Sequence, residues 1–278
     1  MKILIYGRGY LGEHFLKYLN EQGEEALFGE ADIANIDQVR KDISTHSPNI
    51  ILNCAGKTGR PNVDWCDDHQ EETIYSNVTG PLILLQAVTE ADIKLVHLGS
   101  GCVYDGNNDG KGFTEKDEPN FEGSFYSKTK AWSEKMLNEF PVLQLRLRMP
   151  IDGNAGPRNF ISKITKYEKV INVPNSMTVI EDLLPASYEL MKQGETGIFN
   201  MTNPGAIDHK TILEMYQEIA DPTYKFEIMS VEEMYEKYAK AGRSNCLLDA
   251  SKLESKGIHM RPIKEAIRDC IEKGFKKI

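Results

Sequence analysis

The sequence predicts an α/β protein, with a Rossmann-type doubly wound parallel sheet and a smaller C-terminal substrate-binding lobe. Two observations lead to this fold class. A buried-looking apolar run at residues 2–6 leads straight into Gly7-Arg8-Gly9-Tyr10-Leu11-Gly12, which has the spacing of a dinucleotide-binding turn between a strand and a helix. Further along, strand-like apolar runs alternate with helical patterns, which is typical of parallel sheets with right-handed crossovers.

The elements follow in order from these patterns. After the strand at residues 2–6, a helix is expected over residues 13–20, with Leu16 and Leu19 on one face. Further strand-like runs lie at residues 25–28, 49–53, 94–99, 142–149 and 197–201. Helical patterns lie between and after these runs, around Val39 and Ile43, as one long helix through residues 74–88, and at residues 126–137, 212–219 and 231–241.

Two polar stretches interrupt this alternation. Residues 105–123 are rich in glycine and asparagine and are too long for an ordinary connection, so they form either a disordered excursion or a lid over the site, and we favour the lid. Residues 152–157 follow the last strong strand and mark the start of a second lobe. The sequence therefore predicts a cofactor-binding domain at 1–150 and a substrate lobe at 151–278, with some segments of the latter returning to the first domain.

Composition narrows the class of function. The chain has 278 residues, 40% of them hydrophobic, and a formal net charge of −9. A chain with net negative charge has no overall positive electrostatic field to attract nucleic acid or an anionic membrane. No apolar run approaches the roughly 18 residues of a membrane span, so we expect a cytoplasmic protein. The five cysteines show neither disulfide-framework nor zinc-site spacing, so reduced thiols and no metal site are expected.

Three residues suggest redox chemistry on an alcohol or ketone. Tyr126 and Lys130 lie one helical turn apart, and Ser100 ends an upstream strand. A nearby cation favours the phenolate of a tyrosine, whose unperturbed pKa is about 10, and so suits it to acid–base work. Taken singly, each residue has a simpler explanation: Tyr126 as a half-buried aromatic, Lys130 as a solvated helix lysine and Ser100 as a cap. Their combination behind a dinucleotide turn favours catalysis.

The glycine loop supplies the cofactor candidates. Gly7 permits the tight turn, Gly9 lets backbone amides approach a pyrophosphate, and Gly12 lets the helix pack on the strand. Glu30, at the end of the second strand, is a candidate for the ribose hydroxyls of NAD, whereas Arg8 is a candidate for the extra phosphate of NADP. The remaining candidates, from the same loop and from the ends of the second and third strands, are Tyr10, Leu11, Asp32, Asn53, Ala55 and Gly56.

Several blocks of the sequence resemble a known family, the extended short-chain dehydrogenase/reductases, and within it the dTDP-4-dehydrorhamnose reductase branch. The sequence most resembles the bifunctional nucleotide-rhamnose synthases, which epimerise UDP-4-keto-6-deoxy-glucose at C3 and C5 and then reduce C4. The resemblance covers nearly the whole chain, although the glycine loop is one residue shorter than the family pattern. The blocks lie at residues 58–66, at Gly123-Ser124-Phe125-Tyr126-Ser127-Lys128-Thr129-Lys130, at Arg148-Met149-Pro150-Ile151, at Pro157-Arg158-Asn159-Phe160 and at residues 173–177.

The resemblance implies roles for the catalytic residues. Tyr126 donates the proton to O4, Lys130 lowers the pKa of that tyrosine and holds the ribose, and Ser100 hydrogen-bonds the carbonyl. NADPH is the implied cofactor, with NADH as an alternative. Three functions stay open: a bifunctional 3,5-epimerase/4-reductase, which we favour, a 4-ketoreductase that acts after a separate epimerase, and a non-catalytic nucleotide-binding regulatory subunit.

Epimerisation needs a second pair of proton-transferring groups. Cys102 matches the acid/base cysteine of the similar GDP-fucose synthases, and Lys163 stands where those enzymes carry a histidine. The alternatives are a small buried residue for Cys102 and an exposed or phosphate-binding lysine for Lys163. None of the six histidines has a comparable claim, because His97 lies in a strand as a core residue and the others lack evident partners.

The remaining expectations concern substrate and assembly. Asn77 is expected to brace the active-site helix, and a nucleotide-linked 4-keto-6-deoxy-glucose is the expected partner, with the choice between UDP and dTDP open. The helices at 74–88 and 126–137 are expected to pair in a homodimer. The substrate candidates for the sugar are Thr58, Arg60 and Asn62, with a structural turn as the alternative for Arg60 and Asn62. The candidates for the diphosphate are Asn159, Lys163 and Arg243, with a surface ion pair as the alternative for Arg243.

Overall fold

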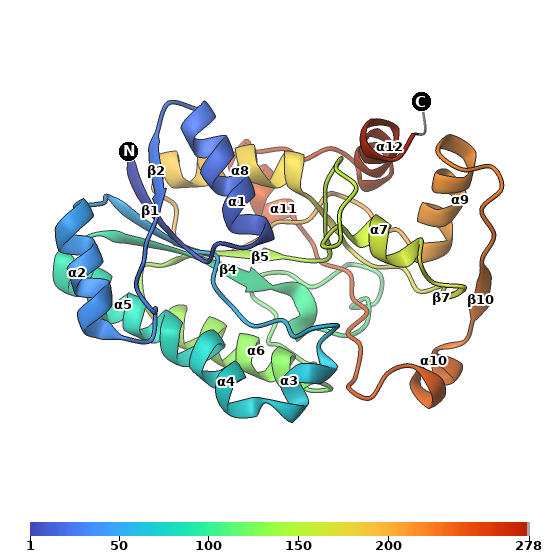
Figure 1. The fold of residues 1–278 in the computed structure, drawn as a ribbon, viewed down its shortest axis with the longest axis horizontal. Coiled ribbons are helices and arrows are strands. Elements are labelled where there is room, and N and C mark those ends of the chain that lie inside the picture. The colour runs from blue at the N-terminus through green and yellow to red at the C-terminus, as the bar shows by residue number, and fades with distance from the viewer. Residues whose placement is uncertain (277–278) are drawn as a thin grey trace.

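A six-stranded parallel sheet forms the centre of the computed structural model, which describes residues 1–276 (Figure 1). Every neighbouring pair of strands is parallel, which confirms the predicted fold class. The order of the strands changes direction between β1 and β3, and ligands of such sheets bind at this switch point. In spatial order the strands are β2 (Glu25–Phe28), β1 (Lys2–Tyr6), β3 (Ile50–Asn53), β4 (Lys94–Ser100), β5 (Leu143–Leu147) and β9 (Gly197–Asn200).

Helices cover both faces of this sheet (Figure 1). One face packs on α1 (Tyr10–Glu21) and α8 (Ile180–Gln193), with Phe15 and Leu183 in the shared core. The other face packs on α2 (Ile36–His46), α5 (Gly80–Ala91) and α6 (Phe125–Leu137), with Val39 and Leu84 in its core. The sheet is thus apolar on both sides, as the near-continuous apolar strands predict.

Some predicted bounds differ from the structure for local reasons. The helix expected from residue 13 begins at Tyr10, because Gly9 already caps it. The long helix expected over residues 74–88 consists of α4 (Gln70–Ile74), a π-helical turn at Tyr75–Thr79 and α5, and Ile74 is exposed rather than in the apolar stripe. The strand expected to run to residue 149 ends at Leu147, since Met149 has a positive φ of 44°.

The C-terminal part of the chain forms a second layer of short elements at one end of the sheet (Figure 1). Its own core joins residues such as Ile161, Ile212 and Ile267. Within residues 151–276, however, β9 is a strand of the main sheet, and α8 and α11 (Ser251–Ser255) pack against that sheet. The elements of the lobe are β6 (Pro150–Ile151), α7 (Phe160–Ile164), β7 (Lys169–Ile171), β8 (Thr178–Val179), α9 (His209–Ile219), β10 (Glu227–Met229), α10 (Val231–Lys237) and α12 (Ile263–Gly274). The domain boundary at residue 150 stays a prediction.

The lid prediction for residues 105–123 is wrong. The segment lies along residues 245–249, with bridges from Gly106 to Cys246 and from Phe113 to Leu248. Phe113 stacks on Tyr104 with 4.5 Å between ring centroids, and both rings are buried. No residue of the segment lines the main pocket. The segment is polar overall, but its buried residue Phe113 packs on Tyr104 and holds the segment against residues 245–249, away from the pocket.

The helices give no sign of a membrane-spanning segment. Within residues 1–276, each is too short or too polar to cross a bilayer.

Candidate active site

The main pocket lies beyond the carboxyl ends of β1, β3, β4 and β5, at the switch point of the sheet, and has a volume of about 770 Å³. This size suits a small-molecule ligand. Twelve of the residues predicted for the site line it together, from five separate stretches of chain: Gly9, Tyr10, Leu11, Ala55, Gly56, Thr58, Arg60, Ser100, Cys102, Tyr126, Lys130 and Lys163.

Ser100 and Tyr126 meet at the floor of this pocket. Ser100 is the last residue of β4, and its hydroxyl accepts a hydrogen bond from the amide of Cys102 at 3.2 Å. Its hydroxyl acts to lower the pKa of the Tyr126 phenol, as expected for a polar group beside that phenol. Tyr126 follows Ser124, whose side chain caps α6 by accepting from the Ser127 amide. The end of one strand and the first turn of one helix thus place the two hydroxyls together.

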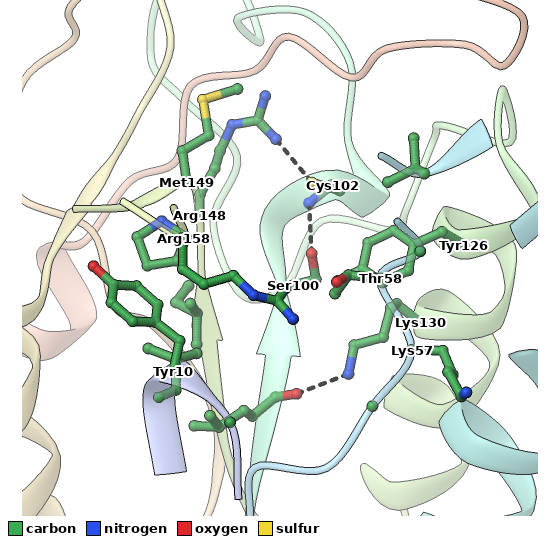
Figure 2. A pocket seen from close by; sticks show the side chains of 18 of the residues that line it. Tyr10, Lys57, Thr58, Ser100, Cys102, Tyr126, Lys130, Arg148, Met149 and Arg158 are labelled. Carbon is green, nitrogen blue, oxygen red and sulfur yellow. Dashed lines mark hydrogen bonds between the residues drawn. The ribbon is translucent and has the colours of Figure 1, made fainter. Parts of the chain in front are cut away.

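The largest effects on the pKa of Tyr126 in this structure come from groups other than Lys130, whose role in lowering that pKa stays a prediction. Burial raises the pKa of the Tyr126 phenol well above its ordinary value, and Cys102 adds to the rise, while the Ser100 hydrogen bond and Arg148 act in the opposite direction. The Lys130 Nζ atom is turned to the Leu98 carbonyl, to which it donates at 2.8 Å (Figure 2). A phenol that keeps its proton is suited to give one, which is what reduction of a ketone requires.

The predicted brace at Asn77 is confirmed. This side chain, 1% exposed, lies in the π-helical turn. Its oxygen accepts from the Lys57 amide at 2.7 Å, and its nitrogen donates to the Lys57 carbonyl at 3.0 Å and to the Thr129 hydroxyl at 3.2 Å. Asn77 therefore ties the pocket loop after β3 to the helix that carries Tyr126 and Lys130.

Cys102 lies beside a buried cation. The Arg148 guanidinium donates to its sulfur at 3.5 Å, as Figure 2 shows. Arg148 is 1% exposed and is held by the Ser244 hydroxyl at 2.9 Å, the Ser244 carbonyl at 2.6 Å and the Asn175 amide oxygen at 2.5 Å. Both terminal nitrogens of the guanidinium have partners, whereas the buried Nε atom has none, and the two held arms fix where the thiol stands in the pocket.

Lys163 lines the pocket from α7, in the C-terminal lobe. Burial lowers the pKa of Lys163, and the neighbouring Arg158 cation lowers it further. Arg158 itself reaches into the pocket from the side opposite Tyr126 and Lys130 (Figure 2). A lysine whose pKa is lowered exchanges protons more readily near neutral pH.

The glycine loop is shaped for close approach. Gly7 has a φ of +99°, and a Cβ at this position would lie 2.5 Å from the Ala55 nitrogen. A Cβ on Gly12 would lie 2.0 Å from the Gly7 carbonyl oxygen, whereas one on Gly9 would meet nothing within 4 Å. The loop is thus closed at both ends and open in the middle, at the N-terminus of the twelve-residue helix α1. These residues fit a dinucleotide pyrophosphate.

The two residues predicted to choose between NAD and NADP contact each other. Arg8 forms an ion pair with Glu30, and its guanidinium lies 5.3 Å from the Phe28 ring centroid. Both charged side chains are exposed. Asp32 lies in a neighbouring pocket, where it accepts from the Tyr75 hydroxyl at 3.2 Å.

Four further predicted site residues lie outside the main pocket and have structural partners. Asn53 is buried and bonds the Ala55 amide and the His97 ring. The side chain of Asn62 accepts from the Asp64 amide within its own turn. Buried Asn159 caps α7 and donates to Asp152. The Arg243 fork binds both oxygens of Asp64, at 2.8 and 3.0 Å, so it is the ion pair that sequence reasoning held as the alternative.

Two histidines have partners that the sequence did not reveal. His14 Nε2 lies 3.0 Å from the Asp152 carboxylate, which links α1 to the loop that enters the C-terminal lobe. His97 is buried, as expected, but its ring bonds Asn53 and faces Lys130.

Comparison with known proteins agrees with this geometry. Residues 1–275 match the family model described as the RmlD substrate binding domain. The chain belongs to the RmlD family. Members of this family are extended short-chain dehydrogenase/reductases of nucleotide-sugar and rhamnose biosynthesis, so the predicted family is confirmed.

Three relatives illustrate the similarity. A bifunctional dTDP-4-dehydrorhamnose 3,5-epimerase/dTDP-4-dehydrorhamnose reductase of Arabidopsis thaliana is 43% identical over 95% of this chain and 90% of the relative. A trifunctional enzyme of the same plant, with UDP-glucose 4,6-dehydratase, epimerase and UDP-4-keto-L-rhamnose reductase activities in its name, is 45% identical, but the chain spans only 41% of its length. The crystal structure of the L780 UDP-rhamnose synthase of Acanthamoeba polyphaga mimivirus is 36% identical, covers 98% of this chain and 99% of its own, and superposes with a TM-score of 0.93.

More distant structures with this fold hold NADP, NADPH or NAD⁺. At 17–21% identity they show the shared fold alone.

Sequence reasoning missed two arginines of the RmlD-family site. Arg148 and Arg158 both line the pocket. Both lie in blocks that carried the family resemblance, beside Met149 and Asn159. Their place in those blocks was the available signal, but a lone arginine in sequence reads equally well as a surface residue, and only the fold shows that one is fully buried against Cys102.

Proposed function

We propose that the protein is a bifunctional 3,5-epimerase/4-reductase that converts a nucleotide-linked 4-keto-6-deoxy-glucose to nucleotide-L-rhamnose with NADPH. One observation carries this proposal: a single pocket combines Ser100 and Tyr126, which suit ketone reduction, with Cys102 and Lys163, which suit proton exchange at carbon. A reductase alone needs only the first pair.

Reduction uses the hydroxyl pair at the floor of the pocket. The glycine loop with Ala55 and Gly56 would hold a nicotinamide cofactor, which would supply the hydride for C4. Ser100 orients the C4 carbonyl by donating a hydrogen bond to O4. Tyr126, held protonated by burial, transfers its proton to O4 as the alcohol forms. Lys130 stands one turn along α6, where it serves the ribose and the tyrosine.

Epimerisation uses the other two residues. Inversion beside a ketone requires one group to take the carbon-bound proton and a second to return a proton to the opposite face, with no net change of oxidation state. Cys102 enters the pocket from the end of β4, and Lys163 from α7. The intermediate enolate places its charge on O4, where Ser100 and Tyr126 donate hydrogen bonds.

The carrier is proposed to be UDP. Support comes from the solved relative named a UDP-rhamnose synthase, whereas the bifunctional plant relative is named for dTDP. The cations Arg60, Arg158 and Lys163 line the pocket and suit a diphosphate, with Thr58 at the sugar end of the same wall. A cytoplasmic homodimer through α5 and α6 remains part of the proposal, with Tyr75 and Trp132 exposed on that side.

The test separates the two reactions in one experiment. Purified protein is incubated with UDP-4-keto-6-deoxy-glucose in D₂O, and deuterium at C3 and C5 and oxidation of NADPH are followed separately. Tyr126→Phe is expected to lower NADPH oxidation by about 10²–10⁴-fold. Cys102→Ser is expected to stop deuterium entry at these carbons.

Two outcomes decide between the candidates, and one variant serves as the control. If Cys102→Ser and Lys163→Met leave turnover of the unepimerised sugar unchanged, the protein is a reductase alone. If the wild-type protein turns over neither UDP- nor dTDP-linked sugar, the regulatory-subunit alternative stands. Lys166→Met, a nearby exposed lysine outside the pocket, is the control for Lys163 and is expected to behave as wild type.

A further inference from the structure

The buried ring of His97 lies between two polar partners on different elements. On β4 it is 1% exposed. Its Nδ1 atom lies 3.0 Å from the Asn53 amide nitrogen, at the end of β3, and its Nε2 atom lies 3.4 Å from Lys130 Nζ on α6. One hydrogen-bond partner would be enough to satisfy a histidine in the core. His97 has polar neighbours on both ring nitrogens, and through them it connects β3 to the proposed active-site lysine, Lys130.

The Asn53 amide fixes which ring nitrogen carries the proton. Its oxygen accepts from the Ala55 backbone amide at 3.0 Å, so its NH₂ group must be the side that faces His97. The Nδ1 atom of His97 therefore accepts a hydrogen bond. Burial lowers the pKa of His97 well below its ordinary value, with the Lys130 charge acting the same way, so the ring is neutral. A neutral ring whose Nδ1 accepts carries its proton on Nε2.

This tautomer points an N–H at Lys130. An ammonium group has three N–H donors and no acceptor, so it cannot accept a hydrogen bond from His97 Nε2–H. A neutral amine can, because it has a lone pair. Lys130 already donates to the Leu98 carbonyl at 2.8 Å, and an amine can do this and accept from His97 at once. The arrangement is fully satisfied only when the lysine has given up a proton.

We propose that His97, oriented by Asn53, is a positioning residue that makes Lys130 a proton carrier rather than a permanent ammonium. After each reduction, an N–H bond of Lys130 breaks and the O–H bond of Tyr126 forms, so an ammonium and a phenolate become an amine and a phenol. The amine then accepts the His97 N–H until a proton from solvent restores the ammonium. The turnover step rests on the proposed function, whereas the His97–Lys130 arrangement does not.

The charges around Lys130 agree with this role. Burial lowers the pKa of Lys130 to about 8, while Glu134 on the same helix and Cys102 from the turn after β4 act in the opposite direction. A lysine that titrates near pH 8 can carry either charge during turnover, which one near 10.4 cannot do at neutral pH.

The first test reads the tautomer without substrate or turnover. Protein labelled with ¹⁵N-histidine is studied by long-range ¹H–¹⁵N correlation between pH 6 and 8, and His97→Leu assigns the signal. The expected result is a non-titrating ring with its proton on Nε2. A ring protonated on Nδ1, or one that titrates as an imidazolium in this range, overturns the proposal.

The second test measures Lys130 itself in protein labelled with ¹³C-lysine, using Lys130→Met for assignment. His97→Leu removes the N–H that faces the amine, so the Lys130 midpoint is expected to rise by about half a pH unit or more. Asn53→Asp, similar in volume, turns Nδ1 into the donor and Nε2 into an acceptor for the ammonium, so it should raise the midpoint further. His259→Gln, at an exposed site, is the control. An unchanged midpoint in the folded His97→Leu or Asn53→Asp protein overturns the proposal.

Discussion

The helix that carries Tyr126 and Lys130 is fixed to the sheet by one buried ion pair, and breaking it should cost much of the stability of the protein. Glu134, 4% exposed on α6, accepts from Arg146 of β5 through two hydrogen bonds, at 2.7 and 2.9 Å. Arg146 is 1% exposed, donates to Asn200 at 2.9 Å and lies 5.0 Å from the Tyr104 ring centroid. The perturbation we choose is Glu134→Gln, which keeps the shape and removes the charge.

The expected magnitude follows from this burial. Removing one partner of a buried pair leaves the other charge uncompensated, which typically costs about 3–5 kcal/mol. That is a large part of a typical unfolding free energy of about 5–15 kcal/mol. For a chain of this length the melting temperature should fall by about 6–10 °C, at about 2 °C per kcal/mol. Because α6 also carries the proposed acid, activity should fall at temperatures where the fold still holds.

Urea unfolding followed by circular dichroism measures the change. Lys135→Gln, exposed on the same helix, is the control and should stay within about 0.5 kcal/mol of wild type. The double variant Glu134→Leu/Arg146→Met removes both charges and should be more stable than Glu134→Gln, because no charge is left unpaired. A loss below about 1 kcal/mol in Glu134→Gln would refute the claim that this pair fixes α6.

Three more predictions follow from single contacts. Glu30→Gln frees Arg8 from its ion pair, so the ratio of NADPH affinity to NADH affinity should rise, whereas Arg8→Ala should lower this ratio by about tenfold or more. Fluorescence titration with both cofactors measures the ratio, and equal ratios in the wild-type protein and the two variants would contradict the prediction. Burial raises the pKa of Asp152, but hydrogen bonds, led by that from His14, outweigh burial and lower this pKa to about 2. The Asp152 carboxylate therefore stabilises the fold above its unfolded pKa near 4, and this contribution is lost as the pH falls toward 2. Asp152→Asn should thus show a flatter fall in urea midpoint from pH 5 to 3 than the wild-type protein. Asn77→Ala removes the side-chain partner of the part-buried Lys57 amide and the link to Thr129, and should cost about 1 kcal/mol or more in urea unfolding; a change under about 0.5 kcal/mol would contradict this.

The sequence predicted the sheet because its signals are local. An apolar strand followed by Gly7 and Gly9 indicates a dinucleotide turn without knowledge of distant contacts, and the alternation of runs orders the rest. The π-helical turn at Tyr75–Thr79 leaves no such trace, since its residues are also acceptable in an α-helix. The lid prediction was wrong because composition cannot show which buried cluster a residue such as Phe113 joins.

The site was predictable to the extent that its residues lie in motifs. The Tyr126–Lys130 spacing, and the position of Cys102 two residues after Ser100 at a strand end, indicated a shared site, and the structure brings these side chains into one pocket. Their catalytic roles stay predictions. Sequence spacing does not show in which direction a side chain points or which group it contacts. The Lys130 Nζ atom donates to the Leu98 carbonyl, and Arg243 forms an ion pair with Asp64 instead of lining the pocket. Such choices depend on long-range contacts that only the folded chain defines.

The central claim is that one pocket performs both proton exchange at carbon and reduction of the ketone. The most direct measurement is to incubate the purified wild-type protein with UDP-4-keto-6-deoxy-glucose and NADPH, and to determine the configuration of the product at C3, C4 and C5 by NMR spectroscopy. The account predicts the L-rhamno configuration at all three carbons. A 4-hydroxy product that keeps the starting configuration at C3 and C5 would contradict it.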